Sequence, residues 1–233
     1  MTPSIARRLA AARQAKQPVA LATRLPDGEQ RVWPGDDVSP GLAEALAASL
    51  QRDVTGTVRL ADGETWMITA FNPPVRLILV GAVHAAQALV RMATTTGYAT
   101  IVVDPRAAFA TTERFPGVEL VHEWPDEAMD LLKPDTRTAV ITLTHDPKLD
   151  DPALDRALRS PAFHIGALGS RRTHARRLER LRALGHDDAA LARIKGPVGL
   201  DIGAVTSPEV ALSIMAEIVA VRRHAAERTA KAA

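Results

Sequence analysis

One stretch, Leu77–Arg106, constrains the fold of this 233-residue chain more than any other. It reads LILVGAVHAAQALVRMATTTGYATIVVDPR. A first apolar run ends in Gly81, a segment with helical spacing of apolar residues follows, and a second apolar run ends in Asp104. This order is typical of a βαβ nucleotide-binding unit, which places a phosphate at a helix N-terminus and a ribose beside a carboxylate.

The glycine pattern of such a unit is incomplete here. Its first glycine makes the tight turn, the second admits the pyrophosphate, and the third lets the helix pack on the strand. Gly81 keeps the first role and Ala86 can fill the third, but Val83 stands in place of the second glycine. The segment alone leaves two interpretations open: a working ligand crevice, or a retained fold with altered or lost nucleotide binding.

The rest of the chain divides into two parts near Asn72-Pro73-Pro74. Before this point, short helices (4–15 and 40–52) and short strands (19–23, 30–33, 56–60 and 65–69) are expected. After it, apolar strands alternate with helices, which indicates a parallel sheet. The further strands are expected at 118–122, 138–143 and 162–167, and the further helices at 125–132, 152–159, 170–184, 189–193 and 208–223. We therefore expect an α/β protein: a small α+β domain (1–73) and a parallel-sheet domain (74–233).

Composition excludes several classes of function. The chain has no cysteine, which excludes disulfides, thiolate metal sites and cysteine nucleophiles. No apolar run approaches the length of a membrane span, and the N-terminus does not read as a signal peptide, so we expect a cytoplasmic protein without a membrane partner. The formal net charge is only +2, which gives no argument for a nucleic-acid partner.

Candidate binding residues follow the predicted strands. Open parallel sheets bind ligands beyond the carboxyl ends of their strands. Four strand ends carry polar or flexible residues, and a glycine-bearing loop, 199–203, comes later. The candidates are Gly81, Ala82, Val83, His84, Asp104, Arg106, Thr144, His145, Asp146, Gly169, Ser170, Arg171, Arg172 and Asp201.

Gly169–Arg172 is the strongest candidate for an anion site. Ser170 suits an N-cap, which leaves free N–H groups at a helix start, and the two arginines add bidentate donors. We interpret the arginines further along this helix as a solvated face: Arg176, Arg177, Arg180 and Arg182.

The two candidate histidines each have two interpretations. The His145-Asp146 pair is either an acid–base or metal-ligand pair or a cap at a strand end. His84 lies at a predicted helix start, where it either aids ligand binding or caps the turn. No nucleophile–base pair, metal cluster or known hydrolase motif is recognisable, so we assign no catalytic residue and no metal ligand.

Four segments together resemble a known family. They are LVGAVHAAQALVRMATTTGYATIVVDPRAAFA, TLTHDPKLD, HIGALGSRRT and GPVGLDIGAVTSPEVALSIMAEIVAV. In this order they closely resemble the C-terminal domain of the XdhC family, over about Arg76–Val221. The members are accessory proteins for xanthine dehydrogenase and related molybdenum hydroxylases, including carbon monoxide dehydrogenase.

The resemblance implies a Rossmann-like domain and a chaperone role in cofactor maturation. Family members bind molybdenum cofactor, protect it while its terminal sulfur is installed, and pass it to the hydroxylase. The implied partners are a cysteine desulfurase and the large subunit of the hydroxylase, and a homodimer is possible. In this interpretation the cofactor phosphate would lie on Gly169–Arg172 and on the Gly81 turn.

Two features depart from the family pattern. The family usually has G-x-G-H at the first turn, where this chain has Gly81-Ala82-Val83-His84. Its N-terminal domain usually carries a GGC-type motif, whereas Met1–Asn72 is short and lacks cysteine. This argues against a thiol-dependent step and fits a shortened paralogue.

Three functions therefore compete. The first, a cofactor-delivery protein rather than an enzyme, is the function that the resemblance implies, and the residues are consistent with it. The second is an NAD(P)-dependent oxidoreductase that uses Asp104 or Arg106 at the ribose, and Val83 argues against it. The third is a paralogue that has lost its ligand and only docks to a partner.

Overall fold

The computed structural model describes residues 2–232, with side chains up to His224. The chain forms two compact units, Met1–Pro73 with Arg223–Ala233, and Pro74–Arg222. The last residues of helix α8 (Ser207–Ala232) thus group with the first unit. The boundaries expected from the sequence, 1–73 and 74–233, stay a prediction.

The first unit is an antiparallel sheet with one helix on each face. Its strands pair in the order β2-β1-β4-β3. Helix α2 (Pro40–Arg52) buries Leu42, Leu46 and Leu50 against one face, because leucines four residues apart lie on one side of a helix. Helix α1 (Pro3–Gln14) buries Leu9 against the other face. The strands are β1 (Val19–Arg24), β2 (Gln30–Trp33), β3 (Gly56–Arg59) and β4 (Thr65–Phe71).

The second unit contains a sheet of six parallel strands in the order β10-β9-β8-β5-β6-β7. The chain enters at the central strand β5, moves outward to β6 and β7, and then returns to β8 on the other side of β5. The connections that follow the parallel neighbours β5 and β8 therefore run toward opposite edges of the sheet. In such sheets a ligand crevice opens between the two strands where the connections diverge. The strands are β5 (Arg76–Val80), β6 (Ala99–Val103), β7 (Glu119–Val121), β8 (Thr138–Thr142), β9 (His164–Ala167) and β10 (Ile194–Lys195).

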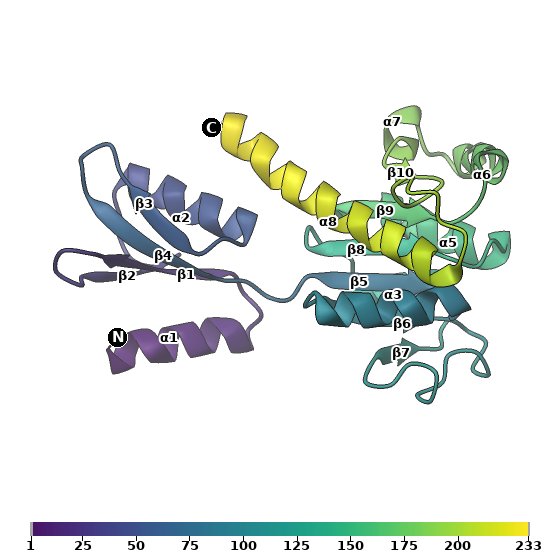
Figure 1. Cartoon of the computed structure of the whole chain (residues 1–233), viewed down its shortest axis with the longest axis horizontal. Coiled ribbons are helices and arrows are strands. Elements are labelled where there is room, and N and C mark those ends of the chain that lie inside the picture. Colours follow the sequence, from purple (N-terminus) through teal and green to yellow (C-terminus); the bar gives the residue numbers. More distant parts are fainter. Residues whose placement is uncertain (1, 233) are drawn as a thin grey trace. The chain divides into compact units, whose positions relative to one another are not determined.

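Helices cover both faces of this sheet (Figure 1). Alternate residues of β5 point to opposite faces. Leu77 and Leu79 pack with α3 (His84–Thr95) and α8. Ile78 and Val80 pack with α4 (Pro125–Leu132), α5 (Pro147–Leu158) and α6 (Arg171–Ala183), and a short α7 (Asp188–Leu191) follows. The predicted fold class, a Rossmann-like parallel sheet after a small α+β region, is confirmed.

Two element bounds expected from the sequence were wrong, and one strand was not expected. Helix α5 begins at Pro147, not at Pro152, because Asp146 caps it by accepting a bond from the Lys148 N–H at 3.0 Å. Pro152 lies inside the helix and Pro147 at its first position, where prolines are favoured. Strand β10 was not expected, since two residues give no periodic pattern, and α8 continues beyond residue 223.

Candidate functional site

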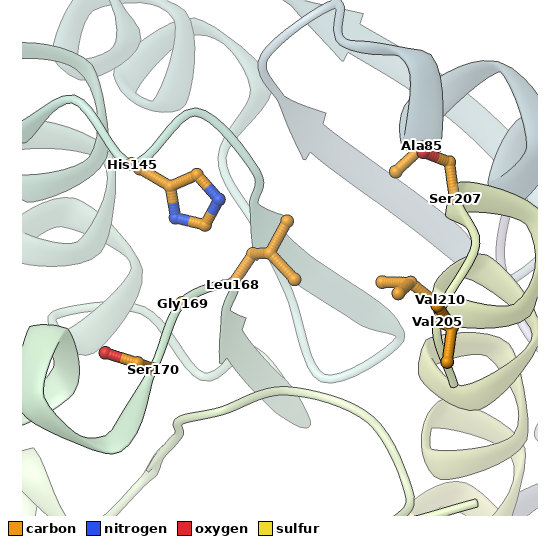
Figure 2. Close-up of a pocket in the computed structure, with 8 residues that line it drawn as sticks. All are labelled: Ala85, His145, Leu168, Gly169, Ser170, Val205, Ser207 and Val210. Carbon is orange, nitrogen blue, oxygen red and sulfur yellow. The ribbon is translucent and has the colours of Figure 1, made fainter. Parts of the chain in front are cut away.

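A pocket of about 390 Å³ opens at the carboxyl ends of β8 and β9. Four short stretches of the second unit contribute to it: the loop after β8, the loop after β9, the first turn of α3 and the start of α8. Figure 2 shows the His145 imidazole and the Leu168 side chain pointing into the space between these stretches. The lining residues are Ala85, His145, Leu168, Gly169, Ser170, Val205, Ser207 and Val210.

The turn after β5 has the geometry expected of the first glycine of the fingerprint. Gly81 has φ +112°, and a Cβ built on it would lie 2.4 Å from Thr144 Cγ2 in the loop after β8. Two features therefore require glycine at this position: the positive φ of the backbone and the close approach of Thr144. Val83, the N-cap of α3, makes no side-chain capping bond, so its side chain does not compete with an anion for the first N–H groups of this helix. The Ala86 N–H donates to the Val83 carbonyl oxygen at 3.1 Å.

Asp104 is bonded to the protein itself and not free for a ribose. Its side chain is 0% exposed. One carboxylate oxygen accepts bonds from Arg106 N and Nε at 3.0 and 2.9 Å. The other accepts from Arg106 Nη2 and from the Ala82 N–H, both at 2.8 Å. Burial acts to raise the pKa of Asp104, but these bonds lower it below its ordinary value. Because these four donors fill the acceptor sites of the carboxylate, Asp104 has no acceptor site left for the hydroxyl groups of a ribose.

Arg106 follows the carboxyl end of β6 and is partly exposed. Its side chain is 41% exposed, and its guanidinium carbon lies 4.6 Å from the centre of the Phe109 ring. The hydrogen bond to Asp104 raises the pKa of Arg106, and the negative charge of Asp146 adds to this. Arg106 and Asp146 thus interact electrostatically across the carboxyl ends of the central strands.

His145 adopts a backbone conformation that is rare for a residue with a side chain. Its φ is +63°, in the left-handed region. Two bonds hold this turn: Thr144 Oγ1 accepts from the Asp146 N–H at 3.1 Å, and Asp146 caps α5. His145 is exposed, and a Cβ on Gly169 would lie 3.5 Å from its Nδ1. Local strain of this kind is concentrated at functional sites, because the surrounding structure must maintain it.

The start of α6 lies at the edge of the pocket. Ser170 is the N-cap and accepts a bond from the Thr173 N–H at 3.1 Å, as the sequence predicted. Arg171 and Arg172 are both exposed beside the pocket residue Ser170. Free N–H groups and two cationic side chains thus lie together at the edge of the pocket.

The interpretation of the later arginines of α6 as a solvated face was wrong for Arg177, whereas the side chain of Arg180 is 40% exposed. Arg177 is 1% exposed and lies 3.3 Å from the carboxylate of Asp150, itself 1% exposed. Arg180 forms an ion pair with Asp151. The sequence held one signal for Arg177: it lies four residues before Leu181, whose side chain is buried on the same side of the helix.

The structure brings together most, but not all, of the candidate residues. Of the fourteen named from the sequence, His145, Gly169 and Ser170 line the pocket, and the others at the four strand ends lie in the adjoining loops and helix starts. Asp201 is exposed and is not among the lining residues. The described residues contain no group of three or more His, Asp or Glu side chains placed to hold a metal ion. Within residues 2–232, none of the helices combines the length and apolar character needed to cross a bilayer.

Comparisons with known proteins agree with this architecture. Residues 77–218 match the model of the family described as XdhC Rossmann domain. The molybdenum cofactor insertion chaperone PaoD of Escherichia coli (strain K12) is 36% identical over 157 residues, which are 67% of this chain and 43% of PaoD. A probable xanthine dehydrogenase subunit of Bacillus subtilis (strain 168) is 32% identical over 160 residues, 68% of this chain and 46% of that protein. This chain thus spans less than half of either relative.

One solved structure shows a similar fold over almost the whole chain. It is the crystal structure of a xanthine dehydrogenase from Bacillus halodurans, with a TM-score of 0.74 and 21% sequence identity. The match covers 97% of this chain and 68% of that one. At this identity the likeness is evidence of the fold alone.

Proposed function

The chain belongs to the XdhC Rossmann-domain family, and we propose that it binds molybdenum cofactor and delivers it to a molybdenum hydroxylase. The client would be of the xanthine dehydrogenase or carbon monoxide dehydrogenase type. The similarity to a cofactor insertion chaperone over 67% of the chain supports a role in handling this cofactor. This role requires two partners, a cysteine desulfurase and the large subunit of the hydroxylase, and a cytoplasmic location belongs to the same proposal.

One observation carries the proposal: the pocket combines anion donors with apolar walls. Its volume of about 390 Å³ falls within the range of small-molecule sites. Leu168, Val205 and Val210 offer apolar contacts to a planar ring system. The uncapped start of α3 and the start of α6 offer N–H groups to a phosphate. These residues fit a pterin with a terminal phosphate, or its dinucleotide form, as a cargo.

The chain's own residues would bind and orient this cargo without changing it. Arg171 and Arg172 would neutralise the phosphate at the edge of the pocket, and His145 would donate or accept a hydrogen bond above Gly169. Walls formed by loops from separate strands can open when a partner docks, which suits a protein that must release its ligand. A carrier needs this set of groups and needs no nucleophile.

The experiment that tests delivery compares cells with and without this protein. We expect the client hydroxylase to be folded in both, but to lose activity and bound molybdenum when the protein is absent. Mass spectrometry of small molecules released from the native protein would identify the cargo. If client activity and molybdenum content are both unchanged, and no paralogue compensates, the delivery role is wrong.

The phosphate site can be tested separately by Arg171→Ala. A charge-assisted hydrogen bond is worth about 1.5–3 kcal/mol, so we expect the affinity for pyrophosphate to fall roughly tenfold or more. Titration calorimetry gives this number. Arg182→Ala is the matched control, because Arg182 lies in the last turn of the same helix and is paired with Asp188. Equal affinities of wild type and Arg171→Ala would remove this site.

A further inference from the structure

A buried ion pair lies beneath the loops that form the pocket. We propose that Asp150 and Arg177 are positioning residues that fix the loops after β8 and β9 in the arrangement the ligand needs. This inference rests on the proposed function, since it concerns the same pocket. It assigns a role to two side chains that do not line the pocket themselves.

The contacts of Arg177 connect helix α6 to the loop after β9. Its Nη2 donates to the Leu168 carbonyl oxygen at 2.9 Å and lies 3.3 Å from Asp150 Oδ2. Leu168 is a pocket residue and precedes Gly169 and Ser170, which also line the pocket. A displacement of the guanidinium would therefore release the backbone of this loop.

The contacts of Asp150 connect the same pair to the loop after β8. Its Oδ1 accepts from Thr144 Oγ1 at 2.7 Å and from the Thr144 N–H at 3.4 Å. Thr144 Oγ1 in turn accepts from the Asp146 N–H at 3.1 Å, so these bonds enclose the left-handed turn at His145. Thr144 also packs on Gly81, which extends the connection to the turn after β5.

Fold stability alone does not account for this pair. A buried ion pair loses hydration, and replacement of such a pair by apolar residues of similar size is often neutral or stabilising. Two further nitrogens of Arg177, Nε and Nη1, are buried without a hydrogen-bond partner among the described residues, which adds to the cost. Burial also raises the pKa of Asp150 above its ordinary value. The pair forms hydrogen bonds to the loop after β8 and to the loop after β9, which an apolar pair could not do.

The same two helices supply a matched control pair. Asp151 of α5 accepts a bond from Arg180 Nη2 of α6 at 3.0 Å. Asp151 is one residue after Asp150, and the bonds of this second pair run only between the two helices. It differs from the first pair in making no hydrogen bond to Thr144 or Leu168.

The test compares two double variants of the full chain. In Asp150→Leu with Arg177→Met, we expect a melting temperature close to that of the wild type, but an affinity for pyrophosphate at least tenfold lower. The backbone amide NMR signals of His145 and Gly169 should shift and broaden, because the loops become mobile. In Asp151→Leu with Arg180→Met, affinity should stay within twofold and both amide signals should be unchanged.

A conservative variant covers the case in which the first double variant does not fold. Thr144→Val keeps the side-chain volume but removes the hydroxyl that bonds to Asp150, and we expect a threefold or greater loss of affinity with a shifted His145 amide signal. Unchanged affinity and amide signals in either Thr144→Val or a folded Asp150→Leu, Arg177→Met variant would overturn the inference. If the wild type binds no pyrophosphate, the proposed phosphate site fails, while the amide signals still decide the positioning role.

Discussion

Gly81 and Thr144 approach each other so closely that a single added carbon would not fit. A Cβ on Gly81 would lie 2.4 Å from Thr144 Cγ2 and 3.4 Å from the Thr144 nitrogen. The turn after β5 and the loop after β8 thus meet at the point where the chain reverses its direction along the sheet. This contact limits how closely the turn after β5 and the loop after β8 can approach each other.

We predict that Gly81→Ala destabilises the second unit by about 2–4 kcal/mol. The left-handed backbone costs about 1–2 kcal/mol for a residue with a Cβ, and overpacking against Thr144 costs about 1–3 kcal/mol more. Urea unfolding gives the difference in the free energy of unfolding. Gly97→Ala is the control, since Gly97 also has a positive φ, +80°, but a Cβ there has nothing within 4 Å. Equal losses in the two variants would contradict the role of the contact.

We predict that Arg106→Met lowers the stability of the protein more at neutral pH than at acidic pH. The pKa of Asp104 is lowered in the folded chain from its ordinary value of 3.8. The ionised carboxylate therefore stabilises the fold at pH values above this ordinary pKa. This stabilisation is lost as the pH falls through the lower pKa that Asp104 has in the folded chain. Without Arg106, burial dominates and the pKa of Asp104 rises, so the ionised form no longer stabilises the fold.

Urea unfolding between pH 3 and pH 7 measures this effect. The difference in unfolding free energy between wild type and Arg106→Met should be largest near pH 7 and should shrink as the medium becomes acidic. Arg114→Met serves as control, because Arg114 lies over the same Phe109 ring but donates to the Phe109 carbonyl oxygen. A difference that is constant with pH would mean that Asp104 does not titrate as argued.

We predict that the unmodified protein binds NAD and NADP weakly, with Kd values of about 1 mM or higher. Val83 replaces the glycine that lets the turn after β5 approach the bridging pyrophosphate of a dinucleotide, whereas the proposed phosphate site lies at the start of α6. Asp104 has its acceptor sites filled by Arg106 and Ala82. Val83→Gly should improve affinity modestly, and Val83→Gly with Arg106→Ser should improve it further, since each oxygen of the Asp104 carboxylate then loses one of its two donors. Tight NAD binding by the wild type, measured by calorimetry, would favour an oxidoreductase instead.

The architecture could be predicted from the sequence because apolar runs and the residues that end them are local features of the chain. Gly81 and Asp104 end apolar runs, and strand ends of that kind are visible along the chain. The helix after β8 was expected too late because Pro152 and Pro147 both suit a helix start, and only the capping bond from Asp146 distinguishes them. The Asp150–Arg177 pair could not be predicted, since it depends on how α5 packs against α6.

The left-handed backbone of His145 leads to a prediction that separates function from stability. His145→Ala removes the imidazole but keeps a Cβ at φ +63°, whereas His145→Gly also removes the Cβ that makes this conformation costly. We expect His145→Gly to be more stable than His145→Ala by about 1 kcal/mol, a difference that urea unfolding can measure. Both variants should activate the client hydroxylase equally poorly, because both lack the imidazole that points into the pocket.

The relation between the two measurements decides what His145 does. If His145→Gly restores stability without restoring client activation, the imidazole acts on the ligand or on its release. Since His145 is exposed and lies outside the apolar clusters of the second unit, its removal should leave those clusters intact. A large fall in melting temperature in both variants would instead show that His145 is a structural cap of the strand end. Such a result would leave Arg171 and Arg172 as the candidate side chains for cofactor binding.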